Sequence, residues 1–542
     1  MDLILSMVHN NPGEPYFDTK FNDSKVVSEY GFNGQVFRQI NTVVTFDKLG
    51  LNLFPAGSDE REWLENFSKP LKESIYDAKR TGLKTFHHID LFVLPKKLVE
   101  HYKGEICDEN GKISIDREIT LKLHSVMFDE LFETIPELDG LIVRVGETYL
   151  HDTPYHTGNG AVNYGDVETE KLLFAKLINF LREEICVKHN KTLIFRTWDC
   201  YNDRFHTNLQ YYLDVTNKIE PHEKLYFSMK YTALDFWRHV KWNECISKGR
   251  HNQIIEIQCQ REYEGKGAYP TYVMNDVING DKSLKNPMGL NIFRGDELVK
   301  GVFVWPRGGG WKGPYSPSEF WSDLNTYVIS HYAKNPERSE KEIFDDFVNE
   351  RLHLSEDDAN AFRKMCIMAD EAILKSRYIS DYDETLKESV MPCCNWMRDD
   401  MLGGLYHLQP AFDVLYKNNK LYEALDEKKD GLCIWKEVFK LCKSIDWSNC
   451  EYGEFIVCSC EYAVKLFTVV YYGWMVITYG QLLEKGVHRE KELREAIKKY
   501  DFSYKEYQEI ANRDNTATLY KPDYYIWDQP GMKESVDRYR NI

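Results

Sequence analysis

Short apolar runs alternate with longer amphipathic segments over the first 330 residues of the chain. The segment 168–184, between two of these runs, carries apolar residues at helical spacing. Eight runs have the length of buried strands: residues 3–8, 34–37, 85–92, 140–145, 192–197, 225–230, 254–258 and 301–305. Eight strands that alternate with helices predict an α/β fold, a (β/α)8 TIM barrel. A doubly wound open sheet is the alternative, although no GxGxxG or P-loop motif supports a nucleotide-binding form of it.

The pattern changes near residue 335. Asn335 and Pro336 interrupt it, and the segments 339–342 and 355–358 have the composition of helix caps. Apolar residues then recur at helical spacing, and strand signals are nearly absent. We therefore expect a barrel domain over residues 1–333 and a mostly α-helical C-terminal domain over residues 334–542.

One uncharged run, 466–479, could be mistaken for a membrane span. It is shorter than the ~20 residues that a helical span needs, and Lys465 stands at its start. We expect a buried core helix or a subunit-interface helix, which makes this domain the candidate for a homodimer contact. The first residues, MDLILSMVHNN, lack a basic region, so we expect neither a signal peptide nor a membrane anchor.

Composition narrows the functional classes. The formal net charge of −17 argues against nucleic acid as a partner, because phosphate binding needs basic surface. The 13 cysteines show no framework spacing, which favours a reducing, cytoplasmic location. The pairs at 393–394 and 458–460 lack the spacing of zinc ligands, so we expect buried free thiols there.

Polar side chains follow the carboxyl ends of the predicted strands. In a barrel these ends meet at the face that holds active sites. A solvated loop charge is the ordinary explanation for any one of them, but together they predict a deep polar pocket. The candidates are His88, Arg144, Glu147, Arg196, Trp198, Tyr201, Lys230, Tyr231, Asp235, Glu262, Trp305 and Arg307.

Carboxylates, cations and aromatic rings in one pocket are typical of a glycosidase. Two carboxyl groups across a glycosidic bond supply the acid and the base or nucleophile. Arg144, Arg196 and Lys230 are more cations than a neutral sugar needs, so we expect an oligosaccharide with an anionic sugar. The alternatives are a barrel that binds sugar without cleaving it, one that acts on another acidic metabolite, and a metal-dependent hydrolase.

The histidines do not favour the metal alternative. Metal-binding barrels place two histidines on one face of a strand, whereas His87 and His88 are adjacent and point to opposite faces. We expect His88 to contact substrate and His87 to pack outside the barrel. We expect no metal and no cofactor.

Several segments resemble consecutive barrel motifs of the glycoside hydrolase family 67 α-glucuronidases. The segment GVFVWPRGGGWKGPYSPSEFWSDLNTY, which leads into the helical region, is also similar. The resemblance covers residues 30–350, and its specificity lies in the order of the motifs. The barrel motifs are GFNGQVFRQIN (31–41), GLKTFHHIDLFVLP (82–95), FRTWDCY (195–201), MKYTALDF (229–236) and EIQCQREYEG (256–265).

The resemblance implies an inverting, exo-acting enzyme that removes a terminal uronic acid from an oligosaccharide. It implies Glu147 as the acid, and Asp235 and Glu262 as the base. It also implies uronate contacts from Arg144, Arg196 and Lys230. The motif of the fourth strand is shorter than the family's Lys-x-x-x-Glu-Gly, and we see no counterpart of the family's N-terminal β-rich domain.

Overall fold

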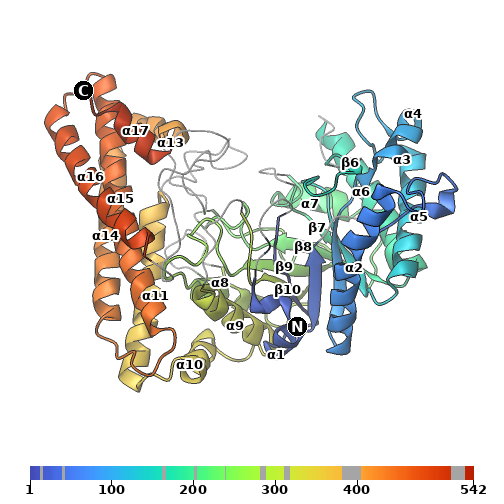
Figure 1. Ribbon diagram of the computed structural model, residues 1–542, viewed down its shortest axis with the longest axis horizontal. Helices are drawn as coiled ribbons and strands as arrows, with labels where there is room; N and C mark the ends of the chain where they lie inside the picture. Colours follow the sequence, from blue (N-terminus) through green and yellow to red (C-terminus); the bar gives the residue numbers. More distant parts are fainter. Residues whose placement is uncertain are drawn as a thin grey trace.

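The computed structural model describes residues 1–11, 16, 18–38, 43–160, 166–199, 204–238, 240–280, 288–310, 318–380, 405–513 and 531–542. Its first part is a closed barrel of eight parallel strands (Figure 1). In order around the barrel they are β1 (Leu3–Ser6), β2 (Gly34–Arg38), β3 (Lys84–Asp90), β5 (Gly140–Arg144), β7 (Thr192–Arg196), β8 (Leu225–Lys230), β9 (Asn252–Gln258) and β10 (Val299–Trp305).

Closure of the sheet decides between the two predicted folds. β10 returns to β1 in parallel, with Leu3 opposite Gly301. Each of the eight predicted strands is confirmed, and the open doubly wound sheet is excluded. Gly301 fits the seam because a Cβ atom there would lie 2.1 Å from the Leu3 carbonyl oxygen.

Helices surround the strands, as a (β/α)8 barrel requires. The helix expected over 168–184 begins at Val167 and changes at Arg182 into a π-helical turn, Arg182–Lys188. The helices of this region are α1 (Ser24–Glu29), α2 (Asp59–Arg80), α3 (Lys96–His101), α4 (Lys103–Ile106), α5 (Glu118–Thr134), α6 (Val167–Leu181), α7 (Leu209–Thr216), α8 (Met274–Asn279) and α9 (Phe320–Lys334).

A small two-stranded antiparallel sheet was not predicted. β4 (Val93–Pro95) pairs antiparallel with β6 (His156–Gly158). Each strand has three residues, too few for a period to show in the sequence. Gly158 permits the pairing, because a Cβ atom there would lie 2.1 Å from the Phe92 carbonyl oxygen.

The C-terminal part is helical, as predicted. Ser339 and Glu342 form the expected capping box, and the Ser355 side chain accepts a hydrogen bond from the Asp358 N–H. In Figure 1, α11, α14, α15 and α16 stand as a bundle beside the barrel. The helices are α10 (Glu340–Arg351), α11 (Glu356–Arg377), α13 (Leu405–Lys417), α14 (Leu421–Cys442), α15 (Gly453–Glu484), α16 (Glu490–Ala511) and α17 (Met532–Arg538).

Helix α15 contains the apolar run 466–479. By length and composition alone it could cross a membrane. It packs between α14 and α16, however, and 56% of its most apolar window is buried inside the protein. This is the position of a core helix.

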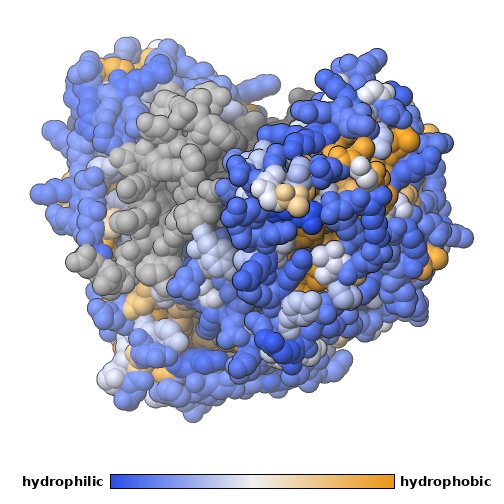
Figure 2. All heavy atoms as spheres, turned by 45° about the vertical axis from the view of Figure 1, so that its right-hand side comes forward, coloured by the Kyte–Doolittle hydropathy of each residue, from blue (hydrophilic) through white to orange (hydrophobic). Residues whose placement is uncertain are grey.

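The described cysteines are free thiols, and all of them except Cys433 are buried. Cys458 and Cys460 lie within α15, whereas the pair at 393–394 lies outside the described residues. The face in Figure 2 is mainly hydrophilic, with a smaller hydrophobic area toward its right-hand edge. The most exposed large apolar side chains, Tyr16, Leu172, Ile292 and Phe502, come from separate segments. The homodimer contact remains a prediction.

Candidate active site

Inward-facing polar side chains fill the carboxyl end of the barrel. Successive residues of a strand point to opposite faces, so His88 and Asp90 of β3 share one face and His87 takes the other. His88 Nε2 lies 3.5 Å from Arg196 Nη1, which places His88 inside the barrel. His87 is fully buried on the outer face.

The deepest charges form a pair between β7 and β9. Arg196 Nε and Nη2 donate to the two Glu256 carboxylate oxygens at 2.8 and 2.7 Å, and the Ser228 hydroxyl donates to the same carboxylate at 2.7 Å. Burial acts to raise the pKa of Glu256, but the Arg196 guanidinium outweighs it and the pKa is lowered. Glu256 is therefore an anion that neutralises Arg196.

Glu256 was not among the predicted site residues. The sequence did contain one sign of this role. Glu256 and Gln258 alternate with Ile255 and Ile257, and this alternation indicates a polar inner face on an otherwise apolar strand. We assigned weight to residues after the strand ends, whereas this carboxylate lies inside β9.

A second pair joins β3 to β5. Arg144 donates to both Asp90 oxygens, from Nε at 2.6 Å and from Nη2 at 2.7 Å, and its Nη1 reaches Glu147 Oε2 at 3.2 Å. The Tyr149 hydroxyl donates to the other Glu147 oxygen at 2.9 Å. The Arg144 side chain is 1% exposed and the Glu147 side chain 33%. Glu147 is thus the accessible end of a buried chain of contacts.

The third pair follows β8. Lys230 Nζ donates to Asp235 Oδ1, and the Tyr263 hydroxyl donates to Asp235 Oδ2. The Lys230 ammonium lies 4.2 Å from the centre of the Trp198 ring and 5.6 Å from that of Trp305. Such distances allow cation–π attraction. With Phe236 at 4.8 Å as well, Lys230 is held between one carboxylate and three aromatic rings.

Glu262 is held by Gln258 of β9. Gln258 Nε2 donates to Glu262 Oε1 at 3.2 Å, and Gln258 Oε1 accepts from the Glu262 N–H at 2.8 Å. Gly309 approaches both residues, since a Cβ atom there would lie 2.1 Å from Gln258 Nε2 and 3.8 Å from Glu262 Cδ. A side chain at residue 309 would displace the Gln258 amide that holds Glu262, so glycine suits this position in the loop after β10.

Trp305 forms an aromatic wall with β1. Its ring stacks on His9 with centroids 4.4 Å apart and planes 9° apart, and the Arg196 guanidinium lies 5.2 Å from its centre. Trp305 Nε1, Ser6 Oγ and Asn11 Oδ1 are buried and have no hydrogen-bond partner among the described residues. Buried polar atoms are seldom left without partners, so such atoms at a barrel mouth indicate a place for water or ligand.

Arg307, two residues after Trp305, lies at the end of this aromatic wall. Its Nε lies 3.6 Å from Glu319 Oε1, and its side chain is buried. Burial lowers the pKa of Arg307, because Glu319 compensates only in part. The two Asp90 contacts and Glu147 have the opposite effect on Arg144, whose pKa is raised despite burial. The pKa of Arg307 is thus shifted in the opposite direction from that of Arg144.

The remaining predicted residues take different places. The Tyr231 hydroxyl accepts from Arg261 Nη1 at 3.0 Å, so this residue contacts the loop after β9. Trp198 lies over Lys230 and packs edge-on against His206. Tyr201 lies outside the described residues.

Among the described residues, one group of metal-ligand type brings three side chains together: Asp129, Glu184 and His189. It lies on α5 and the π-helical turn, away from the strand ends. Lys188 Nζ lies 2.7 Å from Asp129 and 3.0 Å from Glu184. The Lys188 ammonium thus already supplies a positive charge where a cation would sit.

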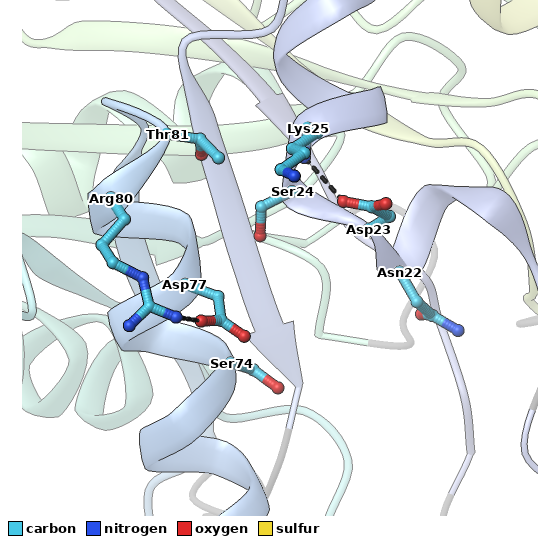
Figure 3. Close-up of a pocket in the computed structure, with 8 residues that line it drawn as sticks. All are labelled: Asn22, Asp23, Ser24, Lys25, Ser74, Asp77, Arg80 and Thr81. Atoms are coloured by element: carbon cyan, nitrogen blue, oxygen red, sulfur yellow. Dashed lines mark hydrogen bonds and ion pairs between the residues drawn. The ribbon is translucent and has the colours of Figure 1, made fainter.

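A cavity of about 590 Å³ lies between α1 and α2 (Figure 3). Its charged residues are engaged locally: Arg80 pairs with Asp77, and Asp23 accepts from the Lys25 N–H. The other lining residues are Asn22, Ser24, Ser74 and Thr81. This cavity is on the outside of the barrel and contains none of the predicted site residues.

No family model and no curated protein matches the chain. Solved structures do match. A GH138 enzyme that targets pectin rhamnogalacturonan II is 12% identical, with all of this chain and 67% of that chain covered, at a TM-score of 0.60. The 4-O-methyl-α-glucuronidase BtGH115A is 9% identical over 84% of this chain and 52% of that chain, at 0.41. A mutant of the Thermobaculum terrenum O-GlcNAc hydrolase is 10% identical over 99% and 93%, at 0.40.

At 12% identity the first likeness shows a shared fold, and the two scores near 0.4 add no further argument. The barrel with its helical domain is therefore supported by comparison as well as by the strand order. The specific resemblance to family 67 remains a prediction.

Proposed function

We propose that the protein is an exo-acting glycoside hydrolase that removes a terminal uronic acid from an oligosaccharide. One observation carries the proposal: the carboxyl end of a closed barrel presents Glu147, Asp235 and Glu262 together with buried cations and an aromatic wall. This is the end at which barrel enzymes act. The shared fold with a GH138 enzyme is compatible with the proposal.

In the proposed reaction Glu147 protonates the leaving oxygen, and Asp235 and Glu262, singly or together, activate water on the opposite face of the sugar. Glu147 suits contact with substrate because its side chain is partly exposed. Asp235 and Glu262 are neighbours through Tyr263, which follows Glu262 in sequence and donates to Asp235. An inverting reaction needs about 6.5–9.5 Å between the acid and the base carboxyl groups.

We also propose a further cation for the uronate contact. Arg144, Arg196 and Lys230 each already have a protein carboxylate as partner. Arg307 also has a carboxylate neighbour, Glu319, with Nε and Oε1 3.6 Å apart. A guanidinium group binds a carboxylate well through two parallel hydrogen bonds. We therefore propose Arg307 as a uronate contact in addition to Arg144, Arg196 and Lys230, because it follows Trp305 at the end of the aromatic wall.

The first test is Glu262→Gln, with hydrolysis of 4-nitrophenyl α-D-glucuronide and of uronide oligosaccharides as the readout. Loss of a general base lowers turnover by about 10²–10⁴-fold. The matched control is Glu118→Gln on α5, an 87% exposed glutamate, which should leave turnover unchanged. NMR of the released sugar should show the inverted anomer. A retained anomer would contradict the inverting mechanism, and full activity of Glu262→Gln would contradict the assigned role.

The second test addresses substrate charge. Arg307→Met should lower kcat/KM for the uronide by about 10–100-fold, the loss expected for a hydrogen bond to a charged group. It should change kcat/KM for the matching neutral glucoside by much less. Equal losses on both substrates would argue against recognition of a carboxylate by Arg307.

A sugar-binding barrel without catalysis is the alternative. It is favoured by the fact that all three proposed catalytic carboxylates accept hydrogen bonds from protein donors. It predicts that the unmodified protein binds glucuronic acid in calorimetry but hydrolyses no uronide.

A further inference from the structure

We infer that Arg261 is a positioning residue that holds the loops bearing Asp235 and Glu262 in one arrangement and ties that arrangement to the helical domain. The inference rests on the proposed function only in treating Asp235 and Glu262 as catalytic carboxylates. The contacts themselves are those of one buried guanidinium group with the loop after β8 and with Glu264 of its own loop.

Arg261 directly precedes Glu262 and reaches across to the loop after β8. Its Nη1 donates to the Tyr231 hydroxyl at 3.0 Å, and its Nη2 donates to the Phe236 carbonyl oxygen at 3.0 Å. Phe236 is the residue after Asp235. One side chain therefore fixes the spacing between the two loops that carry the proposed base carboxylates.

The backbone of both loops is in a conformation that needs such support. Arg261 has φ 61° and Asp235 has φ 47°, both in the left-handed region. Residues other than glycine stay there only when their surroundings hold them. Loss of the Arg261 contacts would let the backbone before Glu262 relax, and the carboxylate would move with it.

Glu264 links this guanidinium to a second one. It accepts from Arg261 Nη2 at 2.9 Å and from Arg238 Nε at 2.8 Å, and it is fully buried. Burial acts to raise the pKa of Glu264, but Arg238 and Arg261 outweigh it and lower the pKa to about 2. Glu264 thus stays charged, and its two cations stay in place, throughout the neutral and mildly acidic range.

Helix α11 completes the network from the helical domain. The Tyr378 hydroxyl, just after α11, donates to Glu264 Oε1 at 2.8 Å, and Asp370 within α11 accepts from Arg238. Trp237 packs edge-on against the Tyr378 ring, with centroids 5.1 Å apart. The bundle therefore contacts the catalytic loops directly through buried polar groups, and it is expected to influence turnover as well as stability.

Two substitutions test this positioning role. We call the contacts of Arg261 with Tyr231, Phe236 and Glu264 the clamp. Arg261→Lys keeps the charge beside Glu264 but cannot reach three acceptors with one planar group. A displacement of about 1 Å at a catalytic group costs about 100-fold in rate. We expect kcat for 4-nitrophenyl α-D-glucuronide to fall by about that factor, with KM changed by less than about threefold. Amide hydrogen exchange should become faster in segments 231–238 and 259–267.

Tyr378→Phe is the milder variant, and it removes one hydroxyl that lies in the helical domain. We expect the same two segments to exchange faster and kcat to fall by about 10-fold, as for one lost hydrogen bond to a charged group. The matched control is Tyr462→Phe, which removes the contact of a hydroxyl with Tyr507 within the bundle. It should change neither kcat nor exchange in the two loops.

The outcomes separate this inference from the proposed function. If the unmodified protein hydrolyses no uronide, the proposed function fails, and the exchange measurements still decide the clamp. Unchanged loop exchange and unchanged kcat in Arg261→Lys would overturn the clamp. If Arg261→Lys does not fold, unchanged loop exchange in Tyr378→Phe would overturn it. If Arg261 acted only through its charge, Arg261→Lys would behave like the unmodified protein.

Discussion

The carboxyl end of the barrel and the core of the helical bundle both bury most of their side chains, but they are filled with different chemistry. The barrel end contains ion pairs, among them Arg196–Glu256, with both side chains at most 2% exposed. The bundle core is aromatic and aliphatic. Trp435 of α14 stacks on Phe467 of α15, for example, with centroids 5.2 Å apart and planes 4° apart.

The difference indicates which region is built for stability and which for chemistry. Burying two charges costs desolvation free energy that their attraction barely repays, so a well-packed apolar pair of similar volume is often at least as stable. A chain that keeps several buried pairs at one end of a barrel gives up stability there. Such clusters of titratable groups are typical of functional sites.

The largest expected effect comes from breaking the deepest pair. Arg196→Met leaves Glu256 buried without its cation, which should lower the free energy of unfolding by about 3–5 kcal/mol. The double variant Arg196→Met with Glu256→Met should recover most of that loss, because no charge remains unpaired. Urea unfolding followed by tryptophan fluorescence measures both. Both variants should lose hydrolysis.

The same two variants can also contradict the contrast that we draw between the charged barrel end and the apolar bundle core. If the double variant is no more stable than Arg196→Met alone, the pair stabilises the barrel and the charges need no functional explanation. If the double variant keeps full hydrolysis, Arg196 has no part in the site.

A smaller effect is expected from the bundle. Leu493 of α16 is 1% exposed, and Leu493→Ala should lower the free energy of unfolding by about 2–4 kcal/mol through the lost apolar contacts and the cavity left behind. Turnover per folded molecule should stay unchanged, because α16 contacts α15 and does not contribute to the Arg261 network. A fall in kcat without a fall in stability would contradict the division of roles between the two regions.

The same difference between apolar packing and ion pairing explains which features of the structure could be predicted from the sequence. Apolar runs and their spacing predicted all eight strands of the barrel, and the cap residues Ser339 and Ser355 predicted the starts of α10 and α11. Apolar patterning records which face of an element is buried, so it describes the bundle core well. The predicted boundary at residues 333 and 334 falls at the end of α9, and the domain division remains a prediction.

Pairing at the barrel end could not be predicted in the same way. Arg144 and Asp90 are 54 residues apart, and Arg196 and Glu256 are 60 apart. Arg144 and Asp90 meet when β5 pairs with β3, and Arg196 and Glu256 meet when the sheet curves around β8, so no local pattern marks them as partners. We predicted Arg144 and Arg196 as uronate contacts from the number of cations and from the family resemblance. The structure adds their protein counter-ions, Asp90 and Glu256, and the uronate contacts remain a prediction. The two strands of the β4–β6 sheet are also far apart in the sequence, and each has only three residues.

The smallest expected effect concerns His156. This residue is neither a member of an ion pair at the barrel end nor an apolar residue of the bundle core. His156 of β6 is buried against Phe54 and Trp63, and neither ring nitrogen has a hydrogen-bond partner among the described residues. Burial lowers its pKa to about 4, with a smaller contribution from Lys96. It is thus a titratable group packed like a core residue and without a counter-ion among the described residues.

The pH dependence follows from that shift. In the unfolded chain a histidine binds its proton below a pKa of about 6.5, whereas folded His156 resists protonation until about pH 4. The unfolded state therefore binds more protons between these values, and stability falls as the pH falls from 6.5 to 4. His156→Phe should remove a loss on the order of 2 kcal/mol over this window. His156→Gln separates titration from packing, since it should flatten the pH profile equally while lowering stability at every pH. If the unfolding free energies of wild type and His156→Phe change in parallel with pH, His156 is solvated or paired in solution, and the barrel rim resembles the charged interior more than the apolar bundle.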